Sequence, residues 1–312
     1  MKSLVTGADG FVGRWLVEHL EASGDEAWRA PGGRADGGPR RRVVDLTDRA
    51  SVDELVAWAE PEAIYHLAAV AFGPDATSDI GHAVDVTVRG TAYLLDAAAR
   101  LATPPRVLIP SSSEVYGRVG PEPVRESHPL EPVSPYGATK VAQESIALAF
   151  MRSRGVPVVV ARAFNHIGPG QRPSFVVPSF AAQLAHIARD ADEPVIRVGN
   201  LGAERDFTDV RDVVRAYRLL VAGDHVGEPI NVASGRVVSI RAILDQLIAL
   251  SGLDVEIVVD PARQRAVDVP VVRGAPDRIH ALTGWEAERS LASTLADVWE
   301  DARSRTASAP IR

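Results

Sequence analysis

The chain of 312 residues contains no cysteine, and only 5% of its residues are aromatic. Without cysteine it forms no disulfide, no zinc–thiolate site and no thiol nucleophile. The sequence also lacks an H-E-x-x-H run, and we expect no metal site. An apolar strand begins by Lys2 or Ser3, which leaves no room for a signal peptide, and no apolar run approaches the roughly 20 residues of a membrane span. We therefore expect a cytoplasmic protein without membrane contact.

Positive charges are fewer than negative ones, 34 lysine and arginine residues against 41 aspartate and glutamate residues. The net charge is -7 at pH 7, whereas nucleic-acid-binding surfaces are normally basic. One arginine run, Arg40 to Arg42, interrupts the acidic background, and we interpret it as a solvated loop rather than a polyanion site. We therefore expect no nucleic-acid partner.

Short apolar runs alternate with helical patterns through about Ala161, which is typical of a Rossmann-type α/β fold with a doubly wound parallel sheet. We expect strands at Ser3–Thr6, Ala27–Ala30, Arg42–Val44, Ala63–His66, Val107–Pro110, Val156–Ala161 and Pro229–Ala233. We expect helices at Phe11–Ala22, Val52–Trp58, Ala83–Leu101, Tyr136–Arg154 and Ile240–Leu250. Ligands of such folds bind at the carboxyl ends of the strands.

Beyond Asn165 the alternation loosens, and proline and glycine become frequent. We interpret this part as chain that leaves the sheet to build a smaller α/β substrate-binding cap over the crevice. The domains are then discontinuous: residues 1–167 and 206–239 form the NAD(P)-binding Rossmann domain, and residues 168–205 and 240–312 form the cap.

A glycine-rich turn follows the first expected strand and opens the first helix. Gly7 permits a tight turn, Gly10 lets the backbone approach a pyrophosphate, and Gly13 lets the helix pack against the strand. The helix N-terminus offers unpaired N–H groups and a partial positive charge to the phosphates. The turn, with Phe11 and Val12 between its glycines, therefore predicts dinucleotide binding.

The second expected strand ends without the carboxylate that normally grips the ribose 2′-hydroxyl of NAD. Arg29 or Arg34 could instead face a 2′-phosphate, so NADP(H) is favoured and NAD(H) stays possible. The alternative is that both arginines are solvated, because a Gly-rich loop holds neither side chain. Asp45, at the end of the third expected strand, is positioned to read the adenine amino group.

Tyr136 and Lys140 stand four residues apart at the start of a helix, and therefore on one face. A buried lysine near the phenol lowers the pKa of Tyr136 and makes it an acid/base near neutral pH. The alternative is an exposed tyrosine and lysine. Ser112, just after the strand that ends at Pro110, favours the first reading, because its hydroxyl can stabilise a substrate carbonyl or alkoxide.

These motifs, together with His66-Leu67-Ala68-Ala69 and Arg162-Ala163-Phe164-Asn165, resemble the extended short-chain dehydrogenase/reductase family that acts on nucleotide sugars. The resemblance implies that Asn165, Arg205 and Arg265 contact the substrate diphosphate, with Asp268 in the same later motif as Arg265. Further substrate contacts are expected from Ser113, Val176 and Arg197. Further cofactor contacts are expected from Leu46, Leu67, Ala68, Ala69, Ala163 and Phe164.

Residues 162–171 and 198–212 are most similar to the GDP-sugar branch of that family, whose reductases act on GDP-4-keto-6-deoxy-D-mannose. The resemblance implies reduction of a C4 ketone by NAD(P)H, with Tyr136 giving the proton and Ser112 polarising the oxygen. A nucleotide-sugar 4-epimerase or a 4,6-dehydratase stays open, since Glu114 stands where dehydratases keep a carboxylate. A non-catalytic dinucleotide-binding protein is the remaining alternative. The family commonly pairs two helices, here Ala83–Leu101 and Tyr136–Arg154, in a homodimer.

Overall fold

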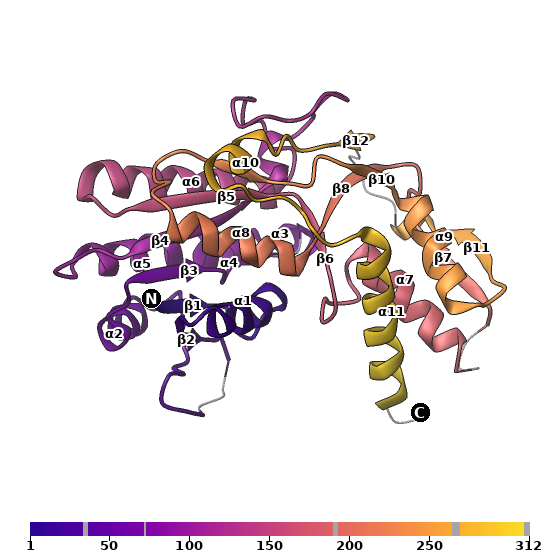
Figure 1. The fold of residues 1–312 in the computed structure, drawn as a ribbon, viewed down its shortest axis with the longest axis horizontal. Coiled ribbons are helices and arrows are strands. Elements are labelled where there is room, and N and C mark those ends of the chain that lie inside the picture. Colours follow the sequence, from indigo (N-terminus) through magenta and orange to yellow (C-terminus); the bar gives the residue numbers. More distant parts are fainter. Residues whose placement is uncertain (34–36, 72, 190–192, 264–268, 309–312) are drawn as a thin grey trace.

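The computed structural model describes residues 1–33, 37–71, 73–189, 193–263 and 269–308. Its centre is a six-stranded sheet in the order β2-β1-β3-β4-β5-β9, in which every neighbouring pair is parallel. The strands are β1 (Lys2–Thr6), β2 (Glu26–Ala30), β3 (Ala63–His66), β4 (Arg106–Ser112), β5 (Val158–Ala163) and β9 (Ile230–Val232). This order confirms the predicted Rossmann-type fold (Figure 1).

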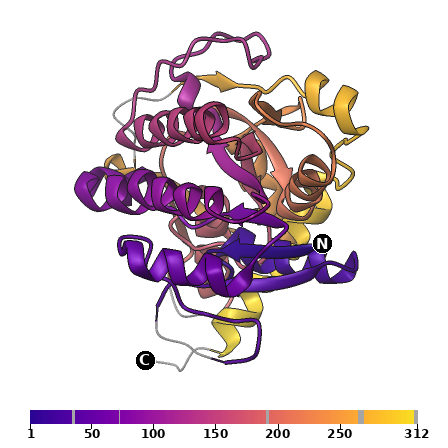
Figure 2. The ribbon, with the colours of Figure 1, turned by 90° about the vertical axis from the view of Figure 1, so that its left-hand side faces the viewer.

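Helices cover both faces of this sheet (Figure 2). On one face α1 (Phe11–Ala22) and α8 (Val210–Ala222) pack together, and α10 (Asp277–Thr283) joins their hydrophobic cluster. On the other face lie α2 (Arg49–Ala59), α5 (Gly90–Ala99) and α6 (Pro135–Arg154). Both faces of the sheet are therefore buried, which explains the near-continuous apolar strands in the sequence. No helix of the described residues is long and apolar enough to cross a bilayer.

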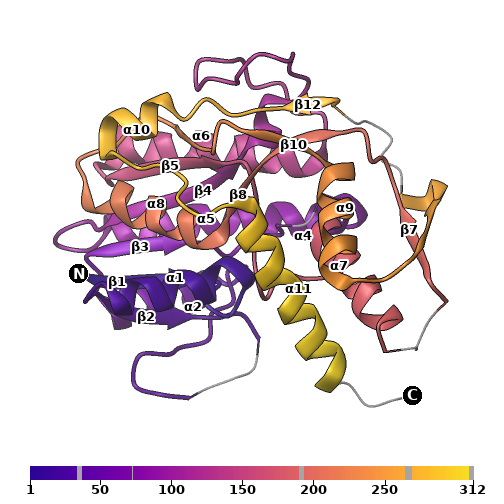
Figure 3. The same cartoon turned by 45° about the vertical axis from the view of Figure 1, so that its right-hand side comes forward.

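A second group of elements lies beyond the carboxyl ends of the strands (Figure 3). The helices α7 (Val176–Ile187), α9 (Ile240–Ser251) and α11 (Leu291–Ser308) share a hydrophobic cluster of their own. Two small sheets accompany them, β7 (Val195–Val198) with β11 (Glu256–Val259), and β8 (Glu204–Asp209) with β6 (Asn165–Ile167), β10 (Val237–Ser239) and β12 (Val271–Val272). The exact domain bounds given above stay a prediction.

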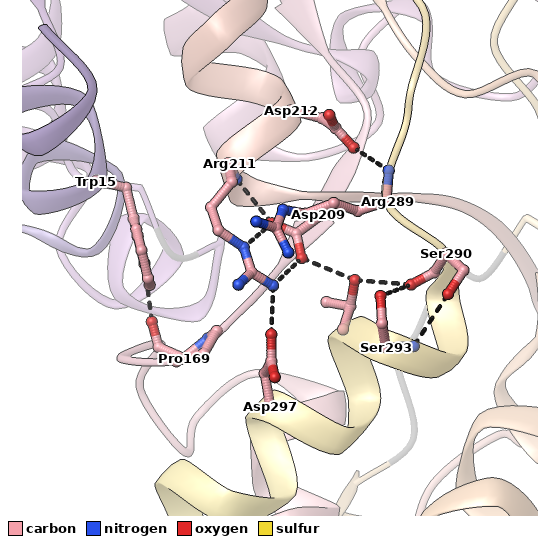
Figure 4. Close-up of polar contacts among 10 residues, drawn as sticks. Trp15, Pro169, Asp209, Arg211, Asp212, Arg289, Ser290, Ser293 and Asp297 are labelled. Atoms are coloured by element: carbon pink, nitrogen blue, oxygen red, sulfur yellow. Dashed lines mark hydrogen bonds and ion pairs between the residues drawn. The ribbon is translucent and has the colours of Figure 1, made fainter. Parts of the chain in front are cut away.

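The last helix, α11, is tied to the start of α8 by a polar network (Figure 4). The Asp209 carboxylate accepts hydrogen bonds from Thr294 Oγ1 at 2.7 Å and from Arg211 Nη2 at 2.6 Å. The same Arg211 nitrogen donates to Asp297 on α11, also at 2.6 Å. Nearby, Trp15 of α1 donates from Nε1 to the carbonyl of Pro169. Helix α11 is therefore held at the junction of β8 and α8.

The predicted strand at Arg42–Val44 is wrong. Among the described residues, this part of the chain pairs with β2 through one isolated parallel bridge, between Arg41 and Arg29. The segment does run along β2, because Val44 N donates to Pro31 O at 3.1 Å. The next bridge would need an N–H donor at position 31, which is a proline and has none.

The predicted helical stretch Ala83–Leu101 is present as one unbroken helical run, but it contains a π-helical turn that the sequence did not indicate. The chain forms α4 (Ile80–Val84), a π-helical turn over Asp85–Arg89, and then α5. Such turns insert one extra residue into a helix, and the Thr91 hydroxyl bonds back to the Thr87 carbonyl at 2.6 Å there. Apolar periodicity did not detect the insertion, because the apolar residues on either side keep a helical spacing.

Candidate active site

The glycine turn brings the ends of β1 and β3 together. Gly7 has φ +68°, and a Cβ there would lie 2.9 Å from the Ala68 nitrogen. Gly10 N donates to Gly7 O at 2.9 Å. A Cβ on Gly13 would lie only 2.1 Å from that carbonyl oxygen, so glycine is needed at position 13 because the turn itself is folded over the helix. The first N–H groups of α1, from Phe11 on, face this turn.

An arginine missed in the sequence contacts the same turn. Arg41 donates to both carboxylate oxygens of Asp9, at 2.8 and 2.5 Å, and its side chain is only 18% exposed. The hydrogen bond from Arg41 lowers the pKa of Asp9, and the charges of Arg29 and Arg14 add to this. The interpretation of the arginine run as a solvated loop is therefore wrong for Arg41. The run itself, in a Gly-rich loop, was the available signal.

Three other residues, Arg29, Arg34 and Asp45, were predicted to contact the adenosine half of the cofactor. Arg29 forms an ion pair with Glu21 of α1 at 2.8 Å. Arg34 lies outside the described residues. Asp45 follows no strand, and its carboxylate accepts from the nitrogen and the hydroxyl of Thr47. Its predicted reading of adenine stays a prediction.

Ser112, Tyr136 and Lys140 converge, as their sequence positions suggested. Ser112 ends β4, and α6 begins one residue before Tyr136 with Ser134 as its cap. The two segments touch closely, because a Cβ on Gly137 would lie 2.7 Å from the Glu114 carbonyl oxygen. The Ser112 hydroxyl lies close enough to the Tyr136 phenol to lower its pKa.

The predicted effect of Lys140 on Tyr136 is wrong in this site. Burial raises the pKa of Tyr136, the charge of Glu114 raises it further, and the hydrogen bond with Ser112 opposes the shift. The Lys140 ammonium lies 6.0 Å from the ring centre and donates instead to Pro110 O and Gln143 Oε1, both at 2.9 Å. Burial lowers the pKa of Lys140 itself to about 8. Tyr136 is therefore held in its protonated form.

Glu114 is attached to the start of α6. Its Oε2 accepts from Ser134 Oγ at 2.8 Å, and Ser134 Oγ in turn accepts from Gly137 N at 3.0 Å. Ser113 opens the same short 3-10 turn, Ser113–Tyr116, and is half-buried. The carboxylate thus lies close enough to raise the pKa of Tyr136, while it is engaged by the helix cap.

Most of the remaining residues predicted to contact the cofactor end or directly follow strands of the central sheet. Ala163 ends β5 and is 6% exposed, and Phe164 follows it with its side chain in a small apolar cluster that includes Tyr116. Half-buried Leu67, Ala68 and Ala69 follow β3. Leu46 is 6% exposed.

The predicted diphosphate contacts Asn165 and Arg205 lie on neighbouring strands, β6 and β8. Asn165 begins β6, is exposed, and pairs opposite Phe207 of β8, two residues beyond Arg205. Arg205 Nη1 donates to the Glu204 carbonyl at 2.8 Å. Exposed Val176 opens α7, and exposed Arg197 lies in β7. Arg265 and Asp268 lie outside the described residues.

Similarity to known proteins covers nearly the whole chain. The profile of the family described as GDP-mannose 4,6 dehydratase matches residues 4–298. GDP-6-deoxy-D-mannose reductase from Pseudomonas aeruginosa is 36% identical over 304 residues, which is 96% of this chain and 97% of that protein.

Solved structures agree with this match. The structure of RMD from Pseudomonas aeruginosa complexed with NADPH has a TM-score of 0.88 at 34% identity, covering 98% of this chain and 100% of that chain. UDP-glucose 4-epimerase from Thermus thermophilus, in complex with NAD, has a TM-score of 0.87 at 27% identity, covering 97% of this chain and 99% of that chain.

Proposed function

Since the chain belongs to the GDP-mannose 4,6 dehydratase family, we propose that it is an NAD(P)H-dependent oxidoreductase that reduces the C4 ketone of a nucleotide-activated 4-keto-6-deoxyhexose. We propose GDP-4-keto-6-deoxy-D-mannose as the substrate, which the name of the Pseudomonas aeruginosa relative supports. The observation that carries the proposal is that Tyr136 and Lys140 on α6 meet the end of β4, where Ser112 lies: the Lys140 ammonium is 6.0 Å from the Tyr136 ring centre and donates to Pro110 O.

NAD(P)H supplies the hydride when bound, and the glycine turn with the N-terminus of α1 would hold its pyrophosphate. The Ser112 hydroxyl donates to the ketone oxygen and stabilises the charge that develops there. Tyr136 gives its phenolic proton to the resulting alkoxide. Lys140 adds a positive charge to the same pocket. Asn165 and Arg205 bind the diphosphate, because a guanidinium suits phosphate oxygens.

The protonation state of Tyr136 favours reduction over the two alternatives. An epimerase or a dehydratase must first oxidise the sugar, which requires Tyr136 to accept a proton. Burial and Glu114 raise its pKa, which keeps Tyr136 in the protonated form that a reductase needs and opposes the phenolate that an oxidation needs. A dehydratase also needs a free carboxylate as base at C5, whereas Glu114 already binds Ser134.

We propose NADPH as the preferred cofactor, with NADH as an alternative. Support comes from Arg41, whose guanidinium contacts the glycine turn and would be available to a 2′-phosphate in competition with Asp9. The related Pseudomonas aeruginosa structure contains NADPH.

The test is a reaction of the protein with GDP-4-keto-6-deoxy-D-mannose and NADPH or NADH in parallel, followed by absorbance and product identification. We expect oxidised cofactor and a GDP-6-deoxyhexose. Release of a keto product from GDP-mannose without net cofactor oxidation would mean a dehydratase. Dinucleotide binding without turnover of any keto sugar nucleotide would mean a non-catalytic protein.

We also propose a cytoplasmic homodimer that uses the outer surface of α6, where Val141 and Phe150 are half-buried and Ala149 is exposed. Leu94 and Ala98 of α5, which belongs to the other helical stretch expected to pair, are fully buried in the cluster on this face of the sheet, so α5 contributes less than expected. Light scattering after gel filtration measures the oligomeric state, and a monomer at micromolar concentration would exclude the dimer.

A further inference from the structure

A chain of buried polar groups connects the glycine turn with Lys140. Thr6 Oγ1 at the end of β1 lies 2.9 Å from His66 Nδ1, and His66 Nε2 lies 3.0 Å from Thr91 Oγ1 on α5. Gln143 Nε2 on α6 donates to Thr91 Oγ1 at 2.8 Å, and Gln143 Oε1 accepts from Lys140 at 2.9 Å. All five residues are buried, with at most 5% of their surface exposed. Four separate elements of the fold therefore contribute to one buried network.

The direction of each hydrogen bond in this network is determined. The Thr91 hydroxyl proton goes to the Thr87 carbonyl at 2.6 Å, so the Thr91 oxygen only accepts from its other neighbours. His66 must then carry its proton on Nε2, and its Nδ1 accepts from the Thr6 hydroxyl. Burial lowers the pKa of His66 to about 3, which keeps the ring neutral with a single N–H. The tautomer is thus set by Thr91.

The same oxygen determines how the Gln143 amide is turned. Because Thr91 Oγ1 accepts, the NH2 group of Gln143 must face it, and the amide oxygen must face Lys140. A flipped amide would point two donors at the ammonium and leave Thr91 without that bond. Two of the three N–H groups of Lys140 are therefore directed at Gln143 Oε1 and Pro110 O.

We propose that Gln143 is a positioning residue, which holds the Lys140 ammonium in place through an amide whose orientation Thr91 and His66 set. The proposal rests on the proposed function only in taking Lys140 as part of the reaction machinery. The ionisable groups facing Lys140 are Glu144 on its own helix, His66 from β3 and Tyr136. Only Glu144 carries a charge that stabilises the ammonium.

The composition of the chain permits a direct measurement. Of its 34 lysine and arginine residues only two, Lys2 and Lys140, are lysines. The protein labelled with carbon-13 at lysine Cε therefore gives two signals, and Lys2, near the surface beside Trp28, is an internal control. The titration midpoint of Lys140 is read without turnover.

The variants form two matched pairs. Gln143→Leu removes the acceptor, and Gln143→Glu replaces it with a negative acceptor of similar size. Thr91→Val removes the oxygen that orients the amide, and Thr91→Ser keeps it. We expect the titration midpoint of Lys140 to fall by about one pH unit in Gln143→Leu and Thr91→Val, because the free energy of a hydrogen bond to a charged group corresponds to about one pKa unit. The midpoint should rise in Gln143→Glu and stay unchanged in Thr91→Ser.

In the reductase assay, Gln143→Leu and Thr91→Val should lower kcat about tenfold to a hundredfold with KM for the sugar nucleotide unchanged, as expected for a displaced reactive group. Equal Lys140 midpoints in folded Gln143→Leu and Gln143→Glu would overturn the proposal. If no keto sugar nucleotide is turned over by the wild type, the proposed function fails, while the titration still decides the role of Gln143. If Gln143→Leu does not fold, the Lys140 midpoints of Thr91→Val and Thr91→Ser are compared instead, and equal midpoints in these two variants would overturn the proposal.

Discussion

Glu144 and Arg162 form a bidentate ion pair in the interior, with Arg162 Nε to Glu144 Oε1 at 3.0 Å and Nη2 to Oε2 at 2.7 Å. Arg162 is 4% and Glu144 2% exposed. Arg162 also donates to Tyr116 Oη at 3.0 Å. The pair joins α6, which carries Tyr136, to β5, so it connects the reactive tyrosine with the sheet.

Glu144→Ala should lower the free energy of unfolding by about 3–5 kcal/mol, because it leaves the Arg162 charge buried without its partner. Urea unfolding measures the change. The matched control is Asp245→Ala, which removes the exposed i,i+4 partner of Arg241 and should cost less than about 0.5 kcal/mol. Similar losses in both variants would show that the interior pair has no special contribution.

Tyr136→Phe should lower kcat of the reductase reaction by about 10²–10⁴-fold, since the variant lacks the proton donor, while NADPH still binds. Steady-state kinetics and fluorescence titration with NADPH separate the two effects. Tyr65→Phe is the control, because the buried Tyr65 hydroxyl has no hydrogen-bond partner among the described residues. Unchanged turnover in Tyr136→Phe would exclude the proposed proton transfer.

Gly13→Ala should abolish measurable dinucleotide binding and destabilise the protein, because its Cβ would lie 2.1 Å from the Gly7 carbonyl oxygen. The turn must then open, which displaces the backbone that would face the pyrophosphate. Equilibrium dialysis with NADPH, together with thermal unfolding, measures both effects. Gly120→Ala, where the added Cβ meets open space, is expected to behave as wild type.

Arg41→Ala should weaken the binding of NADPH about tenfold and leave the binding of NADH nearly unchanged, since a charge-assisted contact to the 2′-phosphate is lost. Dissociation constants for both cofactors come from fluorescence titration. Arg42→Ala removes the next arginine, which pairs with Glu54 on the surface, and should alter neither. An equal effect on NADPH and NADH in Arg41→Ala would place the 2′-phosphate elsewhere.

The stability of the protein should fall as the pH falls from about 6.5 toward 3. Burial lowers the pKa of His66 from 6.5 to about 3. In that window the unfolded chain binds a proton that the folded chain does not, so stability rises with pH by about 1.4 kcal/mol per pH unit for this one proton. Urea unfolding at pH 7.0, 6.0 and 5.0 measures the slope.

His66→Gln should be less stable than wild type at pH 7, because it disturbs the bonds to Thr6 and Thr91. Its stability should nevertheless depend less steeply on pH below 6.5. The same substitution at exposed His82 is the surface control. A slope in His66→Gln as steep as that of the wild type would show that another group takes up the proton.

Features that depend on backbone geometry over a few residues were determined by the sequence alone. The glycine turn, the parallel alternation of strands and helices, and the pairing of Tyr136 with Lys140 on one helical face all follow from local spacing. Ser112 joined them because the carboxyl ends of parallel strands share one edge of the sheet. These predictions succeeded because chain connectivity restricts neighbours in sequence to a few arrangements.

Contacts between distant segments were decided only by the tertiary structure. Arg41 pairs with Asp9 across a loop of glycine and proline, and Gln143 meets Thr91 from another helix. The tertiary structure also decided that the pKa of Tyr136 is raised, since this shift depends on burial of the phenol and on Glu114 rather than on Lys140. Burial and side-chain direction are set by packing of the whole chain, and the spacing of residues carries no record of them.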